Sequence, residues 1–441
     1  MPPESQRAKV HNVTFGTGYS IFHSTILPAI AQAETEVILT TCFWAPSPTL
    51  AALNQTLRTL SQTCLQNNKN KNKNEKIKIR IGFSSSSSSW SSSLTQKLLP
   101  PSRKTHPPST WNSRFGLPSE DELPGLDVEV KSVFFLPLSV WHSKFVLVDR
   151  RRVFLPSCNV SWEEWLEGCV EMEGGGIVRE FVEFWRGNWN WNCEGEEEGE
   201  RGEEGQTDDE IIEDGIIAES HGSQLPSPIA SAYTFLPSPH TRHPHFQPLP
   251  FQPPRPPPST PLNTHLLAFL TTAQREIHLQ TPNLTSPPVL EALTGALERG
   301  VAVTVITNEK LMVLEQLLTA GTTTARCVRA LIGDYGRWRE RRRGDEEAEV
   351  GVVGRPGRLR ISYYEPLGGG GEGVEAVRSH LKLTIVDDRI VVFGSGNMDR
   401  ASWYTSQELG VAFYSEELVA ETRRLLEEKL KGRTRVVYDS G

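Results

Sequence analysis

The sequence predicts an internally duplicated α/β fold, and three observations lead to this prediction. Residues 141–149 and 379–387 both read His, one residue, Lys, four residues and then Asp. A similar order of apolar periodicities precedes each copy, which is typical of an internal repeat. A polar tract with few apolar residues separates the two halves. The chain has 441 residues, which is enough for two units of this size.

The first half, assigned to residues 1–192, is expected to begin with alternating helices and strands. The apolar spacing predicts helices at 24–34 and 49–66 and strands at 36–41 and 76–83. Two stretches rich in Asn, Lys, Ser and Pro, near 67–75 and 84–125, are expected to be disordered loops.

The second half, assigned to residues 263–441, repeats this order, so that Glu36 corresponds to Glu276 and His142 to His380. The expected helices are 264–274 and 289–299, and the expected strands are 276–281 and 301–307. A last amphipathic helix is expected near 415–431. We interpret it as packed on the core rather than lying on a membrane surface.

Residues 193–262 between the halves are predicted to be a disordered insert. It is first acidic, over 193–214, and then Pro-rich, over 224–261. So few apolar residues bury too little surface to offset the entropy of ordering the chain. Three histidines lie in the Pro-rich part, namely His240, His243 and His245. We interpret them as members of a solvated linker, and metal binding is the alternative.

Composition and charge exclude several classes of protein. A net charge of −8 argues against broad affinity for nucleic acid. The six cysteines show no Cys-x-x-Cys spacing, so neither a zinc site nor a disulfide framework is expected. The N-terminus lacks the apolar core of a signal peptide, and no run of about 18 apolar residues predicts a membrane span. An intracellular protein is therefore expected, cytoplasmic or peripheral to a membrane.

The two repeated stretches also bring reactive side chains together. Both are apolar and β-branched, so each is predicted to be a strand on which the His and the Lys project to one side. Each strand turns at its Asp into a second apolar run, and this hairpin brings a hydroxyl and an amide beside the His. Ammonium and N–H donors suit phosphodiester oxygens, and an imidazole can attack phosphorus or move a proton. The predicted phosphate-binding residues are Lys144, Ser157 and Asn159 in the first copy and Lys382, Ser395 and Asn397 in the second.

With these residues the sequence resembles the phospholipase D superfamily, whose signature is His-x-Lys, four residues, Asp, six residues and Gly-Ser-x-Asn. The second copy matches at every position, whereas the first has Pro156 where the family has Gly. The resemblance covers roughly 20–192 and 263–432. It implies two pseudo-symmetric lobes, each with a mixed sheet flanked by helices. It also implies a phosphohistidine intermediate with no metal and no other cofactor, since two Lys and two Asn neutralise the phosphoryl oxygens.

The resemblance also implies roles within one joined site. His142 is assigned as the nucleophile and His380 as the general acid and base. The carboxylate that orients a histidine is expected to be Glu408, eleven residues after the Asn of the second motif. In the first half the nearest equivalent is Glu171, and Glu167 is its rival.

The aspartates of the catalytic motif, Asp149 and Asp387, fall at the predicted turns and off the face that carries His and Lys. We therefore interpret them as structural members of the motif.

These features predict a metal-independent phosphodiesterase or phosphatidyltransferase that acts on a phospholipid through peripheral contact with a membrane. A nuclease of the same superfamily is the enzymatic alternative, and the acidic balance of the chain weighs against nucleic acid as its partner. A catalytically idle scaffold that binds anionic lipid is the third interpretation, opposed by the complete His, Lys and Asn sets. One basic cluster, 337–343, is interpreted as a solvated loop, with anionic headgroups or nucleic acid as alternative partners.

Overall fold

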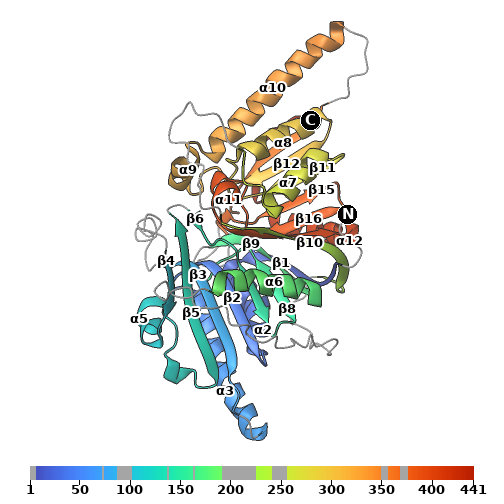
Figure 1. Cartoon of the computed structure of the whole chain (residues 1–441). Coiled ribbons are helices and arrows are strands. Elements are labelled where there is room, and N and C mark those ends of the chain that lie inside the picture. Colours follow the sequence, from blue (N-terminus) through green and yellow to red (C-terminus); the bar gives the residue numbers. More distant parts are fainter. Residues whose placement is uncertain are drawn as a thin grey trace, which may run out of the picture.

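The computed structural model describes residues 6–71, 74–86, 102–136, 139–161, 164–190, 225–240, 256–348, 356–367 and 376–441. A continuous mixed sheet passes through both halves of the chain (Figure 1). In the first half its strands lie in the order β4 (Ser102–His106), β5 (Leu126–Leu136), β3 (Ile77–Ser86), β2 (Glu36–Trp44), β7 (Phe145–Val148), β8 (Arg152–Pro156), β9 (Trp165–Glu173) and β1 (Arg7–Thr17). In the second half the order is β10 (Ile229–Ser238), β17 (Glu408–Tyr414), β16 (Ile390–Gly394), β15 (Leu383–Val386), β11 (Glu276–Gln280), β12 (Ala302–Thr307), β13 (Leu359–Tyr364) and β18 (Thr434–Asp439).

The two halves meet at the antiparallel pair β1 and β10, where Val10 lies opposite Ile229. Outward from this seam, each half shows four antiparallel pairings followed by two parallel pairings. Two short strands complete the pattern, since β6 (Ser139–Val140) pairs with β5 and β14 (Arg378–Ser379) pairs with β9. The internally duplicated α/β architecture predicted from the sequence is therefore confirmed.

Helices cover both faces of the sheet. On one face, α6 (Gly175–Trp189) and α12 (Glu416–Leu430) lie over a core that takes residues from both halves, such as Phe145 and Phe393. On the other face, α2 (Leu27–Ala31) and α3 (Pro48–Lys71) cover the first half, and α7 (Pro261–Thr272) and α8 (Pro287–Glu298) cover the second. Alternation along a strand divides these cores, because Val37 and Leu39 face α3 while Ile38 faces the shared core.

The remaining helices are short except for α10, which has 25 residues. They are α1 (Gly18–Ile21), the π-helix η1 (Phe22–Ile26), the 3₁₀ helices η2 (Pro108–Thr110) and η3 (Glu120–Glu122), α5 (Trp111–Phe115), α9 (Val313–Ala320), α10 (Thr324–Ala348) and α11 (Arg400–Tyr404). Helix α10 projects from the end of the second half in Figure 1. No helix in the described part of the chain is both long and apolar enough to cross a membrane.

The helices and strands predicted from periodicity agree closely with the structure. The helix expected at 49–66 lies within α3, and the strand expected at 276–281 is β11. The last predicted helix is α12, and its leucines Leu418, Leu425 and Leu426 are buried in the shared core. The interpretation of this helix as packed on the core is confirmed.

The prediction of a disordered insert is wrong for residues 225–240. This segment contains β10, which pairs with β1 on one side and with β17 on the other. Its backbone groups are satisfied by two neighbours, and Tyr233 and Leu236 are buried. The second repeat therefore begins in β10 rather than at residue 263. The stretches 193–224 and 241–255 lie outside the described residues.

The loops expected near 67–75 and 84–125 are also partly wrong. Residues 67–71 continue α3, and 84–86 complete β3. Residues 102–125 form β4, α5 and the turns around them, because Trp111, Phe115 and other apolar side chains from this stretch are buried in the first-half core. Residues 72–73 and 87–101 lie outside the described residues.

The basic cluster at 337–343 belongs to α10 and is not the loop that its charge suggested. Arg339 donates to the carbonyl of Ser440 at 3.1 Å and lies over the ring of Tyr335. At least one arginine of this cluster, Arg339, therefore makes its contacts within the protein.

Candidate active site

The segment that carries each motif histidine lies along a strand of the opposite half. The His142 N–H donates to the Gln407 carbonyl at 2.9 Å, directly before β17. In the mirrored arrangement, the His380 N–H donates to the carbonyl of Leu166 in β9 at 2.8 Å. The two motifs are thus brought together by backbone contacts between the halves.

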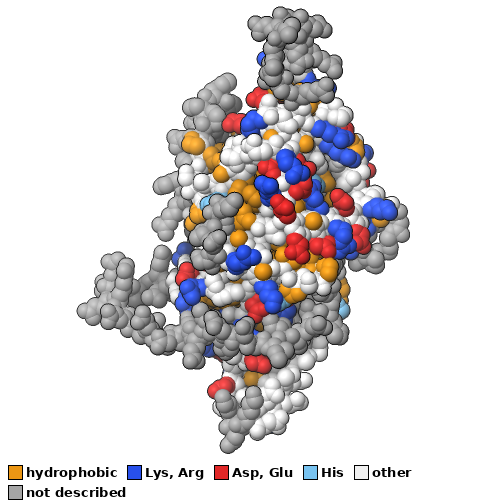
Figure 2. Space-filling model, turned by 90° about the vertical axis from the view of Figure 1, so that its right-hand side faces the viewer, with side chains coloured by type: hydrophobic (Ala, Val, Ile, Leu, Met, Phe, Trp, Pro, Cys, Tyr) orange, Lys and Arg blue, Asp and Glu red, His pale blue; other side chains and the backbone are white. Residues whose placement is uncertain are grey.

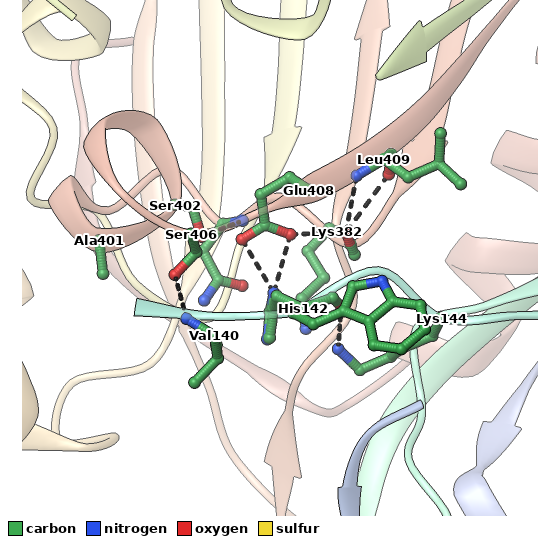
Figure 3. Close-up of polar contacts among 12 residues, drawn as sticks. Val140, His142, Lys144, Lys382, Ala401, Ser402, Ser406, Glu408 and Leu409 are labelled. Atoms are coloured by element: carbon green, nitrogen blue, oxygen red, sulfur yellow. Dashed lines mark hydrogen bonds and ion pairs between the residues drawn. The ribbon is translucent and has the colours of Figure 1, made fainter. Parts of the chain in front are cut away.

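Each histidine is paired with a glutamate of the other half. Nδ1 of His142 lies 2.9 Å from both carboxylate oxygens of Glu408, as Figure 3 shows. Nδ1 of His380 lies 2.8 Å from Oε1 of Glu167. The pairs are related by the same pseudo-symmetry as the sheet. A carboxylate on Nδ1 holds the proton there and leaves Nε2 as the reactive nitrogen.

Burial and charge set the protonation of these pairs. Burial lowers the pKa of His380 to about 3, and burial also lowers the pKa of His142, so both imidazoles are neutral at pH 7. Burial alone would raise the pKa of Glu408, but its histidine and the charge of Lys144 outweigh this effect and hold that pKa below its usual range. Glu408 is therefore an anion that accepts a hydrogen bond from the Nδ1–H of a neutral histidine.

The motif lysines lie beside the histidines and are buried. The Lys144 ammonium donates to the His142 carbonyl at 2.8 Å, and the Lys382 ammonium donates to the His380 carbonyl at 2.5 Å. An ammonium has three N–H donors, so each lysine keeps donors for a substrate. Burial lowers the pKa of Lys382 to about 7.

The motif serines do not serve as predicted. The Ser395 hydroxyl donates to Glu408 at 2.5 Å, and the Ser157 hydroxyl donates to Glu167 at 2.5 Å. A hydroxyl can donate only one hydrogen bond, and here the carboxylate accepts it. The prediction that these serines donate to the phosphate is therefore wrong, since they hold the glutamates in place.

The motif asparagines keep N–H donors. Asn397 gives one of its two amide protons to Asp399 at 3.0 Å, and Asp399 also caps α11. In the first half, the Asn159 side-chain oxygen accepts from the N–H of Phe43 at 3.2 Å, so the NH₂ group of Asn159 points away from Phe43.

Comparisons with known proteins agree with this arrangement. A domain model described as cardiolipin synthase, PLD-like domain, matches residues 266–430. The second half of the chain is therefore similar to a phospholipase D-like domain. No curated protein matches its sequence.

Three solved structures are similar to this chain, and the first of them, with a TM-score above 0.5, supports its fold. Phosphatidylserine synthase from Haemophilus influenzae Rd KW20 matches with a TM-score of 0.53 and 13% identity, over 98% of this chain and 89% of that one. The phospholipase D family member Nuc from Salmonella typhimurium matches with a TM-score of 0.29 and 17% identity, over 47% and 97% of the chains. Polyphosphate kinase from Porphyromonas gingivalis matches with a TM-score of 0.45 and 11% identity, over 95% and 50%.

The assignment of Glu171 as the orienting carboxylate in the first motif is wrong, and its rival Glu167 takes the place. Glu171 is buried four residues further along β9, where it pairs with Arg152. Sequence counting failed because α11 lengthens the connection in the second half, so the orienting glutamate follows its Asn at a larger separation there. Both carboxylates project to the same side of β9, and alternation along the strand does not distinguish them.

The superfamily aspartates hold turns outside the site. The carboxylate of Asp149 accepts from the backbone N–H groups of residues 34, 35 and 36, and Asp387 accepts from those of 274, 275 and 276. Both aspartates have positive φ, as a tight hairpin turn requires. These contacts agree with the structural interpretation and remove Asp149 and Asp387 from the reacting groups.

The one departure from the superfamily signature leaves the site geometry unchanged. After Pro156, the Ser157 N–H donates to the Gly168 carbonyl at 2.8 Å, and after Gly394, the Ser395 N–H donates to the Leu409 carbonyl at 2.9 Å. A Cβ at Gly394 would lie 2.4 Å from the Leu409 carbonyl oxygen, so the glycine is needed only in the second half.

Two residues near the site were missed or misinterpreted. The ring of Trp165 lies 4.8 Å from that of His380. His240 is not a solvated linker residue, because its Nδ1 lies 2.8 Å from the Ser139 hydroxyl and 2.7 Å from the Thr405 carbonyl. It thus joins the segments that lead to His142 and Glu408. The Pro-rich context gave no signal of this role, and His243 and His245 lie outside the described residues. The described residues contain no group of three His, Cys, Asp or Glu side chains arranged to hold a metal.

Proposed function

We propose that this protein is a phospholipase D-type phosphodiesterase or phosphatidyltransferase that acts on phospholipids through a phosphohistidine. The observation that carries the proposal is the reciprocal pairing of His142 with Glu408 and of His380 with Glu167, with both motif lysines alongside. The names of the cardiolipin synthase-like domain and of the phosphatidylserine synthase support phospholipid as the substrate class.

In the first step, Nε2 of His142 attacks the phosphorus and the bond to the leaving alcohol breaks. The proton stays on Nδ1 of His142, and the Glu408 carboxylate that accepts a hydrogen bond from it stabilises the positive imidazole ring that forms. Nε2 of His380 gives its proton to the leaving oxygen. The phosphodiester is an anion, so its binding raises the pKa of His380 from the low value of the free site, and Nε2 takes up this proton from the solvent before the step.

In the second step, neutral His380 takes a proton from water or from an acceptor alcohol. The resulting oxygen nucleophile attacks phosphorus, the P–N bond breaks, and its electron pair returns to Nε2 of His142. Water gives hydrolysis, and an alcohol gives transfer of the phosphatidyl group. The order of the two histidines follows the resemblance to the superfamily.

The negative charge on the phosphoryl oxygens is met by this chain's own donors. These donors are the ammonium groups of Lys144 and Lys382, which are close enough for one to lower the pKa of the other, and the amide N–H groups of Asn159 and Asn397. Fixed donors in a buried site stabilise developing charge more strongly than water does. The reaction is therefore proposed to need no metal ion.

The test uses purified full-length protein with EDTA. It is offered short-chain phosphatidylcholine, phosphatidylglycerol and phosphatidylserine as micelles, with and without glycerol, and single-stranded DNA separately. We expect release or exchange of a headgroup, abolished in the His142→Ala variant. Cleavage of DNA with all lipids untouched would replace phospholipid by nucleic acid as the substrate. Activity that requires one added ion would refute the metal-free mechanism.

A further inference from the structure

An apolar helix face lies open to solvent beside the candidate active site. In α9, Val313, Leu314, Leu317 and Leu318 are 38%, 54%, 40% and 47% exposed. Residues at positions i, i+1, i+4 and i+5 share one side of a helix, so the four form one apolar patch. A cluster of exposed apolar side chains indicates a surface that binds a partner or a membrane.

The opposite side of α9 is fixed to the second half of the chain. Gln316 is buried, and its side-chain oxygen accepts from the Thr324 N–H at 2.6 Å and from the Thr324 hydroxyl at 3.0 Å. Gly321, in the left-handed conformation, ends the helix. The patch is therefore presented by an anchored helix.

Helix α9 is also tied to the active-site wall. Arg400, the first residue of α11, donates to the carbonyl of Thr319 in α9 at 3.3 Å. The residue before it, Asp399, binds the amide of the motif residue Asn397. Figure 1 shows α9 next to α11, on the side of the molecule where β6 leads to His142.

Exposed basic side chains lie close to the apolar patch. Lys310 precedes α9, and Arg326 and Arg329 are exposed on the first turns of α10. Arg378, two residues before His380, is exposed and lines one pocket with Lys310. Figure 2 shows the right-hand side of the molecule in Figure 1, which is not the side of α9. On that face, basic and acidic side chains are interspersed.

We propose that α9 docks this protein on a phospholipid bilayer that carries anionic headgroups. The four apolar side chains enter the interfacial region, and Lys310, Arg326 and Arg329 meet the headgroups. This inference rests on the proposed function, because docking at this rim presents membrane phospholipid to the histidines. The patch and the basic residues together match a lipid surface, which has both an apolar layer and negative charge.

The test measures flotation of the full-length protein with vesicles of equal parts phosphatidylcholine and phosphatidylglycerol. We expect the affinity of the Leu314→Ser, Leu318→Ser double variant for these vesicles to be at least about tenfold lower. The matched control is Val436→Ser, since Val436 is 46% exposed on the edge strand β18, and it should bind as the unaltered protein does. Turnover of a water-soluble phosphodiester should be the same in all three proteins.

The outcomes separate docking from catalysis. Unchanged vesicle binding by the double variant would overturn the docking inference, even if phospholipid is hydrolysed. Vesicle binding that depends on α9, in a protein that hydrolyses no phospholipid, would support docking and refute the proposed function. If sedimentation without lipid shows the unaltered protein as a dimer and the double variant as a monomer, with vesicle binding unchanged, the patch joins two copies of the chain and the inference is wrong.

Discussion

His142 and Glu408 stand 266 positions apart in the sequence, yet Nδ1 of the histidine contacts both oxygens of the carboxylate at 2.9 Å. His380 and Glu167 form the same contact in the opposite direction. Neither half of the chain therefore contains a complete site. Each half supplies a histidine that the other half orients, so the candidate site exists only where the two halves are packed together.

The two glutamates of β9 give a matched pair of variants. Glu167→Gln should lower kcat about 10²–10⁴-fold, because a neutral amide no longer stabilises the charged form of His380. Glu171→Gln should leave kcat nearly unchanged and should instead lower the free energy of unfolding, since it breaks the buried pair with Arg152. Steady-state kinetics and thermal unfolding of both variants distinguish the two roles. Equal kinetic losses would restore Glu171 as a candidate.

The two histidines are predicted to differ in trapping. His380→Ala lacks the base of the second step, so with a substrate that has a good leaving group it should accumulate a covalent phosphoryl adduct. His142→Ala should form none, and each variant should lose at least about 10²–10⁴-fold in turnover. Intact-protein mass spectrometry under non-acidic conditions detects the adduct. An adduct only on His142→Ala would reverse the roles, and full activity of either variant would refute a joined site.

Anion binding should depend on pH through Lys382. Burial lowers the pKa of this lysine to about 7, so its charge is present below pH 7 and is lost as the pH rises. The affinity for sulfate, which keeps its own charge over this range, should fall by up to about tenfold per pH unit above pH 7. Calorimetric titration between pH 6 and 9 measures this effect.

The control for this titration is Lys382→Met, which should bind sulfate weakly and with little pH dependence. Burial lowers the pKa of His142 and His380 in the free site, so any pH dependence that remains in Lys382→Met reports protonation of His380 on sulfate binding. Affinity that stays constant from pH 6 to 9 in the unaltered protein would contradict the shifted lysine.

Strand β10 should be essential for folding. Leu236 is buried in the second-half core, and Leu236→Ala should lower the free energy of unfolding by about 2–5 kcal/mol. As the control, a Gly/Ser segment of equal length replaces the acidic stretch 199–214, and stability should change by less than about 1 kcal/mol. Denaturant unfolding followed by circular dichroism compares them. A stable Leu236→Ala protein would mean that β10 contributes little.

The sequence was sufficient for the features that depend on local pattern. Apolar periodicity located α3, α8 and α12, because residues three or four positions apart lie on the same face of a helix. The spacing within each His-x-Lys motif predicted a hairpin that turns at its Asp, and β7 with β8 and β15 with β16 form these hairpins.

Other features were decided only by the tertiary structure. Glu167 and Glu171 are both buried glutamates on β9, and only the packing of the opposite half selects Glu167 as the partner of His380. Likewise, β10 lies in a stretch whose surroundings are polar and Pro-rich. It is stabilised by hydrogen bonds to β1 and β17, which stand far away in the sequence. Contacts between the two halves produce no periodic pattern in either segment alone. The pairing within the site and the start of the second repeat could therefore be located only from the tertiary structure.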